Sequence, residues 1–207
     1  MIRIKHLIFD LDETLIRLPV DWPAVYEEVR RSLEISFTDL LNLLTELWGT
    51  KDYGKVSRLI EKFELEALNR VYILDNSREL ILNLSKKFKL SLVTLQGRNV
   101  VEKILSGLGI RKIFEVVVTR DGAPTRFLQL RRVLDETGFR PEETLVIGDK
   151  LDDIESALKL GCWAVLVDRR GRAELLDEPR EKLFVIKNLK DLEKVLYFLQ
   201  EERRSPG

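Results

Sequence analysis

Short apolar runs alternate with amphipathic segments over most of this chain, and the alternation predicts its architecture. The run over 7–9 ends abruptly in acidic residues, which is typical of a buried parallel strand. Further strands are expected over 90–94, 114–119, 144–148, 162–167 and 183–186, and helices over 76–87, 98–108, 124–137, 151–159 and 189–200. Strands joined by single helices imply right-handed crossovers, so the pattern predicts a doubly wound, mainly parallel α/β sheet.

Residues 17–74 interrupt this alternation, because their apolar residues recur only at helical spacing. Asp21 is a candidate N-cap, and Pro23 suits an early helical position. Glycines bracket an expected loop over 48–55. We therefore expect a small helical cap over 17–74, inserted into an α/β core of 1–16 and 75–200, with a frayed tail over 201–207.

Composition and charge change this picture little. Of the 207 residues, 44% are hydrophobic and 34% are charged, as in an ordinary globular protein. Lys+Arg and Asp+Glu both total 35, so nucleic acid and anionic membranes are not expected partners and any phosphate affinity must be local. Neither a signal-peptide pattern nor an apolar stretch of about 18 residues occurs, which favours a cytoplasmic protein. Either a monomer or a homodimer fits these data.

Acidic residues follow two of the expected strands. Asp10 and Asp12 are two apart on an extended segment and face the same side. The second cluster follows the strand over 144–148 and contains Asp149, Asp152 and Asp153. A solvated strand-to-loop junction and a helix N-cap are the simpler explanations. However, the carboxyl ends of parallel strands share one ligand-binding edge, and like charges there need a cation. Carboxylate oxygens suit magnesium.

Thr94 ends another expected strand, and Gln96, Gly97 and Arg98 then open a helix. Backbone N–H groups at a helix N-terminus bind anions, and the Thr94 hydroxyl adds a donor. The alternative is that Thr94 only terminates the strand. This position is therefore a candidate for anion binding, weaker than the acidic clusters.

In order and spacing, these residues resemble the haloacid dehalogenase (HAD) superfamily of phosphohydrolases. Residues 10–14 read Asp-Leu-Asp-Glu-Thr and are similar to the family's DxDxT motif. Thr94 resembles its second motif, 148–153 its fourth motif, GDxxxD, and the helical insertion its type-1 cap. The resemblance covers nearly the whole chain and implies a Rossmann-like HAD core.

The chain departs from the family at the third motif, which usually supplies a Lys just before a helix. No Lys occurs between Lys112 and Lys150. Ungapped alignment places Arg126 at the lysine position, and Arg120 is the alternative. An Arg keeps the positive charge but is longer and planar, so the two residues are not interchangeable. Solvated arginines, or impaired chemistry, are the remaining interpretations.

The resemblance implies a Mg²⁺-dependent phosphoric monoester hydrolase that acts on a small phosphorylated metabolite, such as phosphoglycolate or a sugar phosphate. Asp10 would be the nucleophile that forms an aspartyl-phosphate, and Asp12 the general acid and base. The implied metal ligands are Asp10, the backbone carbonyl of Asp12, and Asp149, with Asp153 (or Asp152) in support. The implied phosphate ligands are Thr94, the N–H of Leu95, and Arg126 or Arg120. Residues 48–55 are the expected specificity loop.

Other functions use some of the same residues. A dehalogenase needs neither the second acid nor a metal, so Asp12 and Asp149 count against it. A phosphomutase would pass the phosphoryl group to a sugar hydroxyl. A catalytically impaired binding or regulatory protein is supported only by the replaced Lys. His6 and Cys162 are expected to be buried and inert, and the arginines over 169–172 to be solvated.

Overall fold

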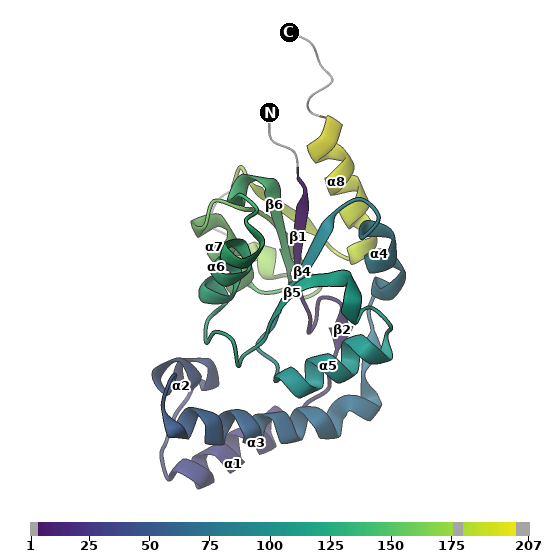
Figure 1. Cartoon of the computed structure of the whole chain (residues 1–207). Coiled ribbons are helices and arrows are strands. Elements are labelled where there is room, and N and C mark those ends of the chain that lie inside the picture. The colour runs from purple at the N-terminus through teal and green to yellow at the C-terminus, as the bar shows by residue number, and fades with distance from the viewer. Residues whose placement is uncertain (1–3, 176–179, 202–207) are drawn as a thin grey trace.

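The structure, a computed structural model, describes residues 4–175 and 180–201. Within these ranges six parallel strands form one sheet in the order β5-β4-β1-β6-β7-β8 (Figure 1). Their bounds are β1 His6–Asp10, β4 Lys89–Val93, β5 Phe114–Val118, β6 Thr144–Gly148, β7 Trp163–Val167 and β8 Leu183–Ile186. The predicted doubly wound α/β fold is therefore confirmed, and each expected strand lies within a residue or two of its observed position.

The strand order reverses at β1, which pairs with β4 on one side and with β6 on the other. The carboxyl end of such a switch point is where open α/β sheets bind ligands. Asp10 is the last residue of β1, beside Val93 at the end of β4. The fold thus brings the ends of β1, β4 and β6 together at one edge of the sheet.

Helices cover both faces of the sheet, because successive strand residues alternate between two apolar layers. Leu7 and Phe9 belong to one buried cluster, and Ile8 belongs to the other. The first layer packs against α4 Ser77–Leu84, α5 Arg98–Gly107 and α8 Leu192–Glu201, and the second against α6 Arg126–Thr137 and α7 Leu151–Lys159. None of the described helices has the length and apolar character of a membrane span.

Three helices, α1 Trp22–Leu33, α2 Leu40–Glu46 and α3 Lys51–Ala67, lie beyond the carboxyl ends of the strands (Figure 1). We call this group the cap helices. Asp21 is the N-cap of α1, as predicted, and accepts a hydrogen bond from Ala24 N at 3.1 Å. The cap helices share their own apolar cluster. The short strands β2 Ile16–Arg17 and β3 Tyr72–Ile73 pair where the chain leaves and re-enters the core.

Two sequence predictions are wrong in this region. The loop expected over 48–55 is mostly helical, because Thr50 caps α3 through Tyr53 N and Gly54 lies inside the helix. The strand β3 lies within 17–74, where only helices were expected. At the C-terminus α8 extends to Glu201, and the rest of the tail predicted to fray lies outside the described residues.

Candidate active site

The Asp10 carboxylate lies at the centre of the candidate site and contacts Arg126. Asp10 is buried, and its Oδ1 accepts a hydrogen bond from Arg126 Nη2 at 2.5 Å. Arg126 is the first residue of α6, so the loop after β5 delivers its side chain to the end of β1. Its Nε lies 2.5 Å from Asp153 Oδ1, an ion pair outside hydrogen-bond geometry. The guanidinium therefore bridges two carboxylates.

Three carboxylates form a cluster that could hold a metal ion. Ligand atoms of Asp10, Asp149 and Asp153 all lie within 4.8 Å of one another. Asp149 Oδ1 is buried and has no hydrogen-bond partner among the described residues. A buried acceptor without a donor is costly unless a cation approaches it. This acidic oxygen set fits a hard divalent cation such as Mg²⁺.

The turn after β6 explains which of the two neighbouring acids joins the cluster. Asp153 Oδ2 accepts a hydrogen bond from Lys150 N at 3.1 Å, which draws the side chain back over Gly148. A Cβ at Gly148 would overlap the Asp153 carboxyl group, so only Gly fits there. Asp152 instead lies within hydrogen-bond distance of Ser156 Oγ, at 3.4 Å. Asp153 thus joins the cluster, whereas Asp152 does not.

Asp12 faces a different environment from Asp10. Its Oδ1 accepts a hydrogen bond from Leu18 N at 2.9 Å, and its side chain is not part of the cluster. Burial raises the pKa of Asp12 to about 6, although the Leu18 N–H opposes this. Burial also raises the pKa of Asp10 to about 7, although Arg126 opposes it. An acid with a pKa near neutrality suits proton transfer.

Gln129 is a functional candidate that the sequence analysis missed. Its Oε1 accepts from Arg126 Nη1 at 2.9 Å, and its Nε2 donates to Thr94 O at 2.8 Å. It is fully buried one turn along α6. The Thr94 hydroxyl itself accepts from Gln96 N at 3.3 Å. Gln129 therefore ties the guanidinium beside Asp10 to the loop that follows β4.

Arg120, the other candidate for the missing Lys, lies in a different network. All five of its guanidinium N–H donors are used, since it bonds to both Glu64 oxygens, both Ser57 oxygens and Leu95 O. Arg120 and Glu64 are 2% and 1% exposed, so the pair is fully buried. The structure thus brings Arg126, and not Arg120, to Asp10.

The N-terminus of α5 was expected to offer backbone donors to an anion, but carboxylates of this chain already occupy it. Gly97 N donates to Glu64 at 3.1 Å, and Asn99 N donates to Glu61 at 3.1 Å, both on α3. Arg98 N donates to Asp121 at 2.9 Å. The helix N-terminus therefore binds the cap helices to the core, and the prediction that it opens toward a ligand is wrong for these donors.

A small cavity of about 70 Å³ lies between the acids and the cap helices. It is lined by Asp10, Asp12, Trp22, Leu40, Leu41, Leu44, Ile60, Glu64, Thr94, Leu95, Gln96, Arg120, Arg126 and Lys150. Trp48, Lys51 and Tyr53, the expected specificity residues, do not line it. The Tyr53 hydroxyl instead donates to Arg120 O at 2.7 Å, and the Trp48 ring packs edge-on against it. That sequence prediction is therefore wrong.

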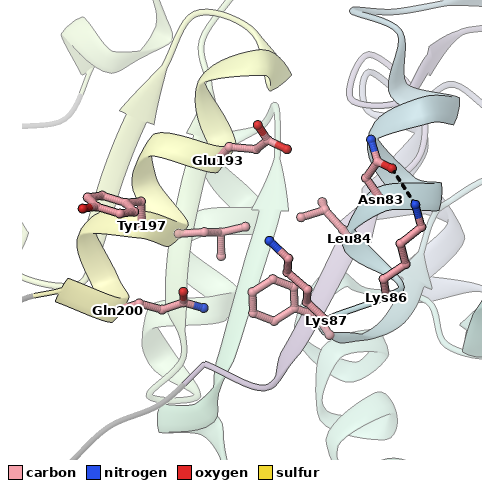
Figure 2. Close-up of a pocket in the computed structure, with 9 residues that line it drawn as sticks. Asn83, Leu84, Lys86, Lys87, Glu193, Tyr197 and Gln200 are labelled. Atoms are coloured by element: carbon pink, nitrogen blue, oxygen red, sulfur yellow. Dashed lines mark hydrogen bonds between the residues drawn. The ribbon is translucent and has the colours of Figure 1, made fainter.

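A larger hollow of about 440 Å³ lies between the end of α4 and α8, at the amino ends of the strands (Figure 2). Lys86 and Lys87 lie on one side of it and Glu193 on the other. None of its lining residues belongs to a sequence motif or to the acidic cluster. The chemistry therefore belongs to the smaller cavity.

Arg172 is a second residue that the sequence analysis missed. Its Nη1 donates to Asp149 Oδ2 at 2.6 Å and to Asp149 O at 2.6 Å. Arg169 pairs with Asp75, and Arg170 with Glu13 at 2.9 Å. The expectation that these arginines are solvated is wrong, because each finds a carboxylate on another segment.

Comparison with known proteins agrees with the site. The family model described as haloacid dehalogenase-like hydrolase matches residues 7–167. An uncharacterized hydrolase of Saccharomyces cerevisiae is 28% identical over 206 residues, covering 95% of this chain and 91% of the yeast protein. The pyrophosphatase PpaX of Oceanobacillus iheyensis is 26% identical over 183 residues, covering 79% and 83% of the two chains. Among solved structures, one described as a putative phosphoglycolate phosphatase from Lactobacillus plantarum aligns with a TM-score of 0.72 and 20% identity, over 93% of this chain and 99% of that chain.

Proposed function

This chain belongs to the haloacid dehalogenase-like hydrolase family, and from that premise we propose that it is a Mg²⁺-dependent phosphatase of a small phosphorylated metabolite. The observation that carries the proposal is the position of Asp10 and Arg126. A buried carboxylate at the end of the central strand lies 2.5 Å from a buried guanidinium, within a closed cavity that admits little water. This arrangement provides a nucleophile beside a cation for the phosphoryl oxygens.

Each acid of the first motif has a separate role in this proposal. Asp10 attacks phosphorus, and the bond from phosphorus to the leaving oxygen breaks, which forms an aspartyl-phosphate. Asp12 gives its proton to the leaving oxygen and later takes one from the water that releases phosphate. The pKa of Asp12, raised to about 6 by burial, allows both steps near neutral pH. Arg126 opposes the effect of burial on the pKa of Asp10 and so favours the anion that attacks.

The phosphoryl oxygens would be bound by Thr94, the Leu95 N–H and Arg126. Arg126 is favoured over Arg120 because Gln129 orients its guanidinium, whereas the donors of Arg120 are all used in the cap network. Asp10, Asp149 and Asp153, with the Asp12 carbonyl, would hold Mg²⁺. When bound, the ion neutralises negative charge on the phosphoryl group and orients it.

The contact between Arg126 and Asp10 also bears on the alternative of an impaired binding protein. That alternative rests on the absent third-motif Lys. In this structure a cation does reach the first-motif carboxylate and the fourth-motif Asp153, so the replaced residue keeps its place and its charge. We therefore favour an active enzyme over a binding protein.

A screen of small phosphate esters with the purified chain, with Mg²⁺ or with EDTA, tests the proposal. We expect turnover that requires the cation and that Asp10→Asn lowers by at least about 10³-fold. Asp152→Asn is the matched control, because it removes a carboxylate from the same region but not from the cluster. Substantial activity in Asp10→Asn, or turnover indifferent to EDTA, would contradict this assignment.

A further inference from the structure

The wall that the cap helices present to the small cavity is almost entirely apolar. Trp22 of α1, Leu40, Leu41 and Leu44 of α2, and Ile60 of α3 line it, together with the single carboxylate of Glu64. The lining contains no Lys or Arg from the cap helices. In a phosphatase of this architecture, the wall opposite Asp10 faces the leaving group. The composition of this wall therefore restricts the leaving group.

The charged residues at the edge of this wall are already neutralised. Glu64 receives two hydrogen bonds from Arg120, at 2.9 and 3.0 Å, and one from Gly97 N at 3.1 Å. Arg120 has spent every guanidinium donor on Glu64, Ser57 and Leu95. Neither residue can bind an ionic leaving group unless this buried network breaks.

The remaining cations in the lining serve the phosphoryl end of the cavity. Arg126 contacts Asp10 and Asp153. Lys150 directly follows Asp149, and its charge acts on both Asp10 and Asp12, which places it on the side of the acids. A phosphate dianion bound at Asp10 would meet both cations. A second anionic group on the leaving side would meet apolar side chains instead.

One polar group in the lining lacks a partner. Gln96 is 6% exposed, and its Oε1 has no hydrogen-bond partner among the described residues. A buried carbonyl oxygen is satisfied by an N–H or O–H donor of a ligand. A hydroxyl group on the substrate would supply that donor without adding charge.

Building on the proposed phosphatase function, we propose that the substrate is the phosphate monoester of a small neutral alcohol that carries a further hydroxyl group. Anionic leaving groups, such as glycolate or a second phosphate, are selected against. An unpaired charge against an apolar wall loses its hydration without gaining a counter-ion. The enzyme would thus prefer substrates of a different charge class from those in the names of its pyrophosphatase and phosphoglycolate phosphatase relatives.

The test compares matched esters in the presence of Mg²⁺. 2-Hydroxyethyl phosphate and phosphoglycolate have nearly the same skeleton and differ in the charge of the leaving group, propyl phosphate lacks the hydroxyl, and pyrophosphate adds an anion. We expect kcat/KM for 2-hydroxyethyl phosphate to exceed that for phosphoglycolate by about 10²-fold, and that for propyl phosphate by at least about tenfold. Equal or reversed rates for the first pair would overturn the proposal.

A substituted cap wall makes the test independent of folding defects. Leu41 lines the cavity but is 43% exposed, so Leu41→Arg adds a cation at the wall with little cost to the core. It should raise the phosphoglycolate to 2-hydroxyethyl phosphate ratio by at least about tenfold. Asn42→Arg adds the same charge one residue further along α2, outside the lining, and should leave the ratio unchanged. Equal shifts in both variants would refute the role of the wall.

Binding separates this inference from the proposed function. Calorimetric titration of Asp10→Asn with the same four compounds reports the preference of the pocket without turnover. If no ester is hydrolysed, the phosphatase assignment fails, while tighter binding of 2-hydroxyethyl phosphate than of phosphoglycolate would still support the pocket chemistry. Tighter binding of phosphoglycolate or pyrophosphate would overturn it, whatever the activity.

Discussion

The buried pair of Arg120 and Glu64 gives the sharpest test of how the cap helices are held. We consider Arg120→Met, Glu64→Leu and the double variant. Arg120→Met removes the guanidinium and leaves the Glu64 carboxylate, 1% exposed, with only the Gly97 N–H. Glu64→Leu leaves the guanidinium, 2% exposed, with carbonyl and hydroxyl acceptors alone. Each single variant therefore strands a buried charge.

The expected magnitude follows from that burial. Removing one partner of a buried ion pair costs about 3–5 kcal/mol, because the other charge keeps its desolvation penalty. The double variant strands no charge and replaces the pair with apolar side chains, so it should lose much less than the sum of the singles. We expect a coupling free energy of about 2–3 kcal/mol, near the upper end for neighbouring residues. An exposed pair would give about 0.2–1 kcal/mol.

Urea unfolding of the full chain measures these free energies. Arg31→Met, Glu28→Leu and their double variant are the matched control, because that pair is 74% and 41% exposed on α1. Hydrogen exchange at Gly97 and Asn99 reports whether the cap contacts open before the core. Additive effects of Arg120→Met and Glu64→Leu, or single costs as small as those of the control pair, would refute the reasoning.

Two further predictions concern a pH dependence and a positioning residue. Burial lowers the pKa of His6 to about 4, so the folded state holds it neutral, and its contribution to stability is complete above the unfolded pKa of about 6.5 and is lost as pH falls toward 4. NMR titration of the chain's single histidine should show that low midpoint, and His6→Gln should remove roughly 3 kcal/mol of pH-dependent stability; a folded midpoint near 6.5 would contradict this. Gln129→Leu should lower kcat by about 10- to 100-fold with folding retained, because Arg126 loses its orienting acceptor, and Gln129→Glu should restore part of it; unchanged kcat in Gln129→Leu would exclude this positioning role.

The sheet and the acidic cluster could be predicted because both depend on local patterns. A short apolar run ending in acids identifies a strand and its end, and parallel pairing then brings such ends together whatever the chain does between them. Asp10 and Asp149 therefore meet as the sequence suggested. Choosing between Asp152 and Asp153 needed the turn geometry around Gly148, which no apolar pattern specifies.

The cap network could not be derived in the same way, because its partners are far apart along the chain. Glu64 and Arg120 are 56 residues apart and meet only when α3 packs beside the ends of β4 and β5. One signal was available in the sequence. Glu64 lies four residues after Ile60, on the face of α3 that also buries Val56 and Ala67, so a charged residue occupied an apolar stripe. A buried charge there implied a cationic partner, although not its identity.

The charges around Asp10 explain why a cation belongs to the proposed function. The cluster contributes three carboxylates, and the described residues in contact with it contribute two guanidiniums, those of Arg126 and Arg172. One negative charge is therefore left over before any substrate binds, and a phosphate monoester would bring up to two more. The exposed Lys150 offsets only part of this at its distance. Because like charges in a buried site repel strongly, phosphate can bind beside Asp10 only together with a divalent ion. A chain that bound phosphate esters equally well with and without Mg²⁺ would have to neutralise that charge by proton uptake, which calorimetry in buffers of different ionisation enthalpy would detect.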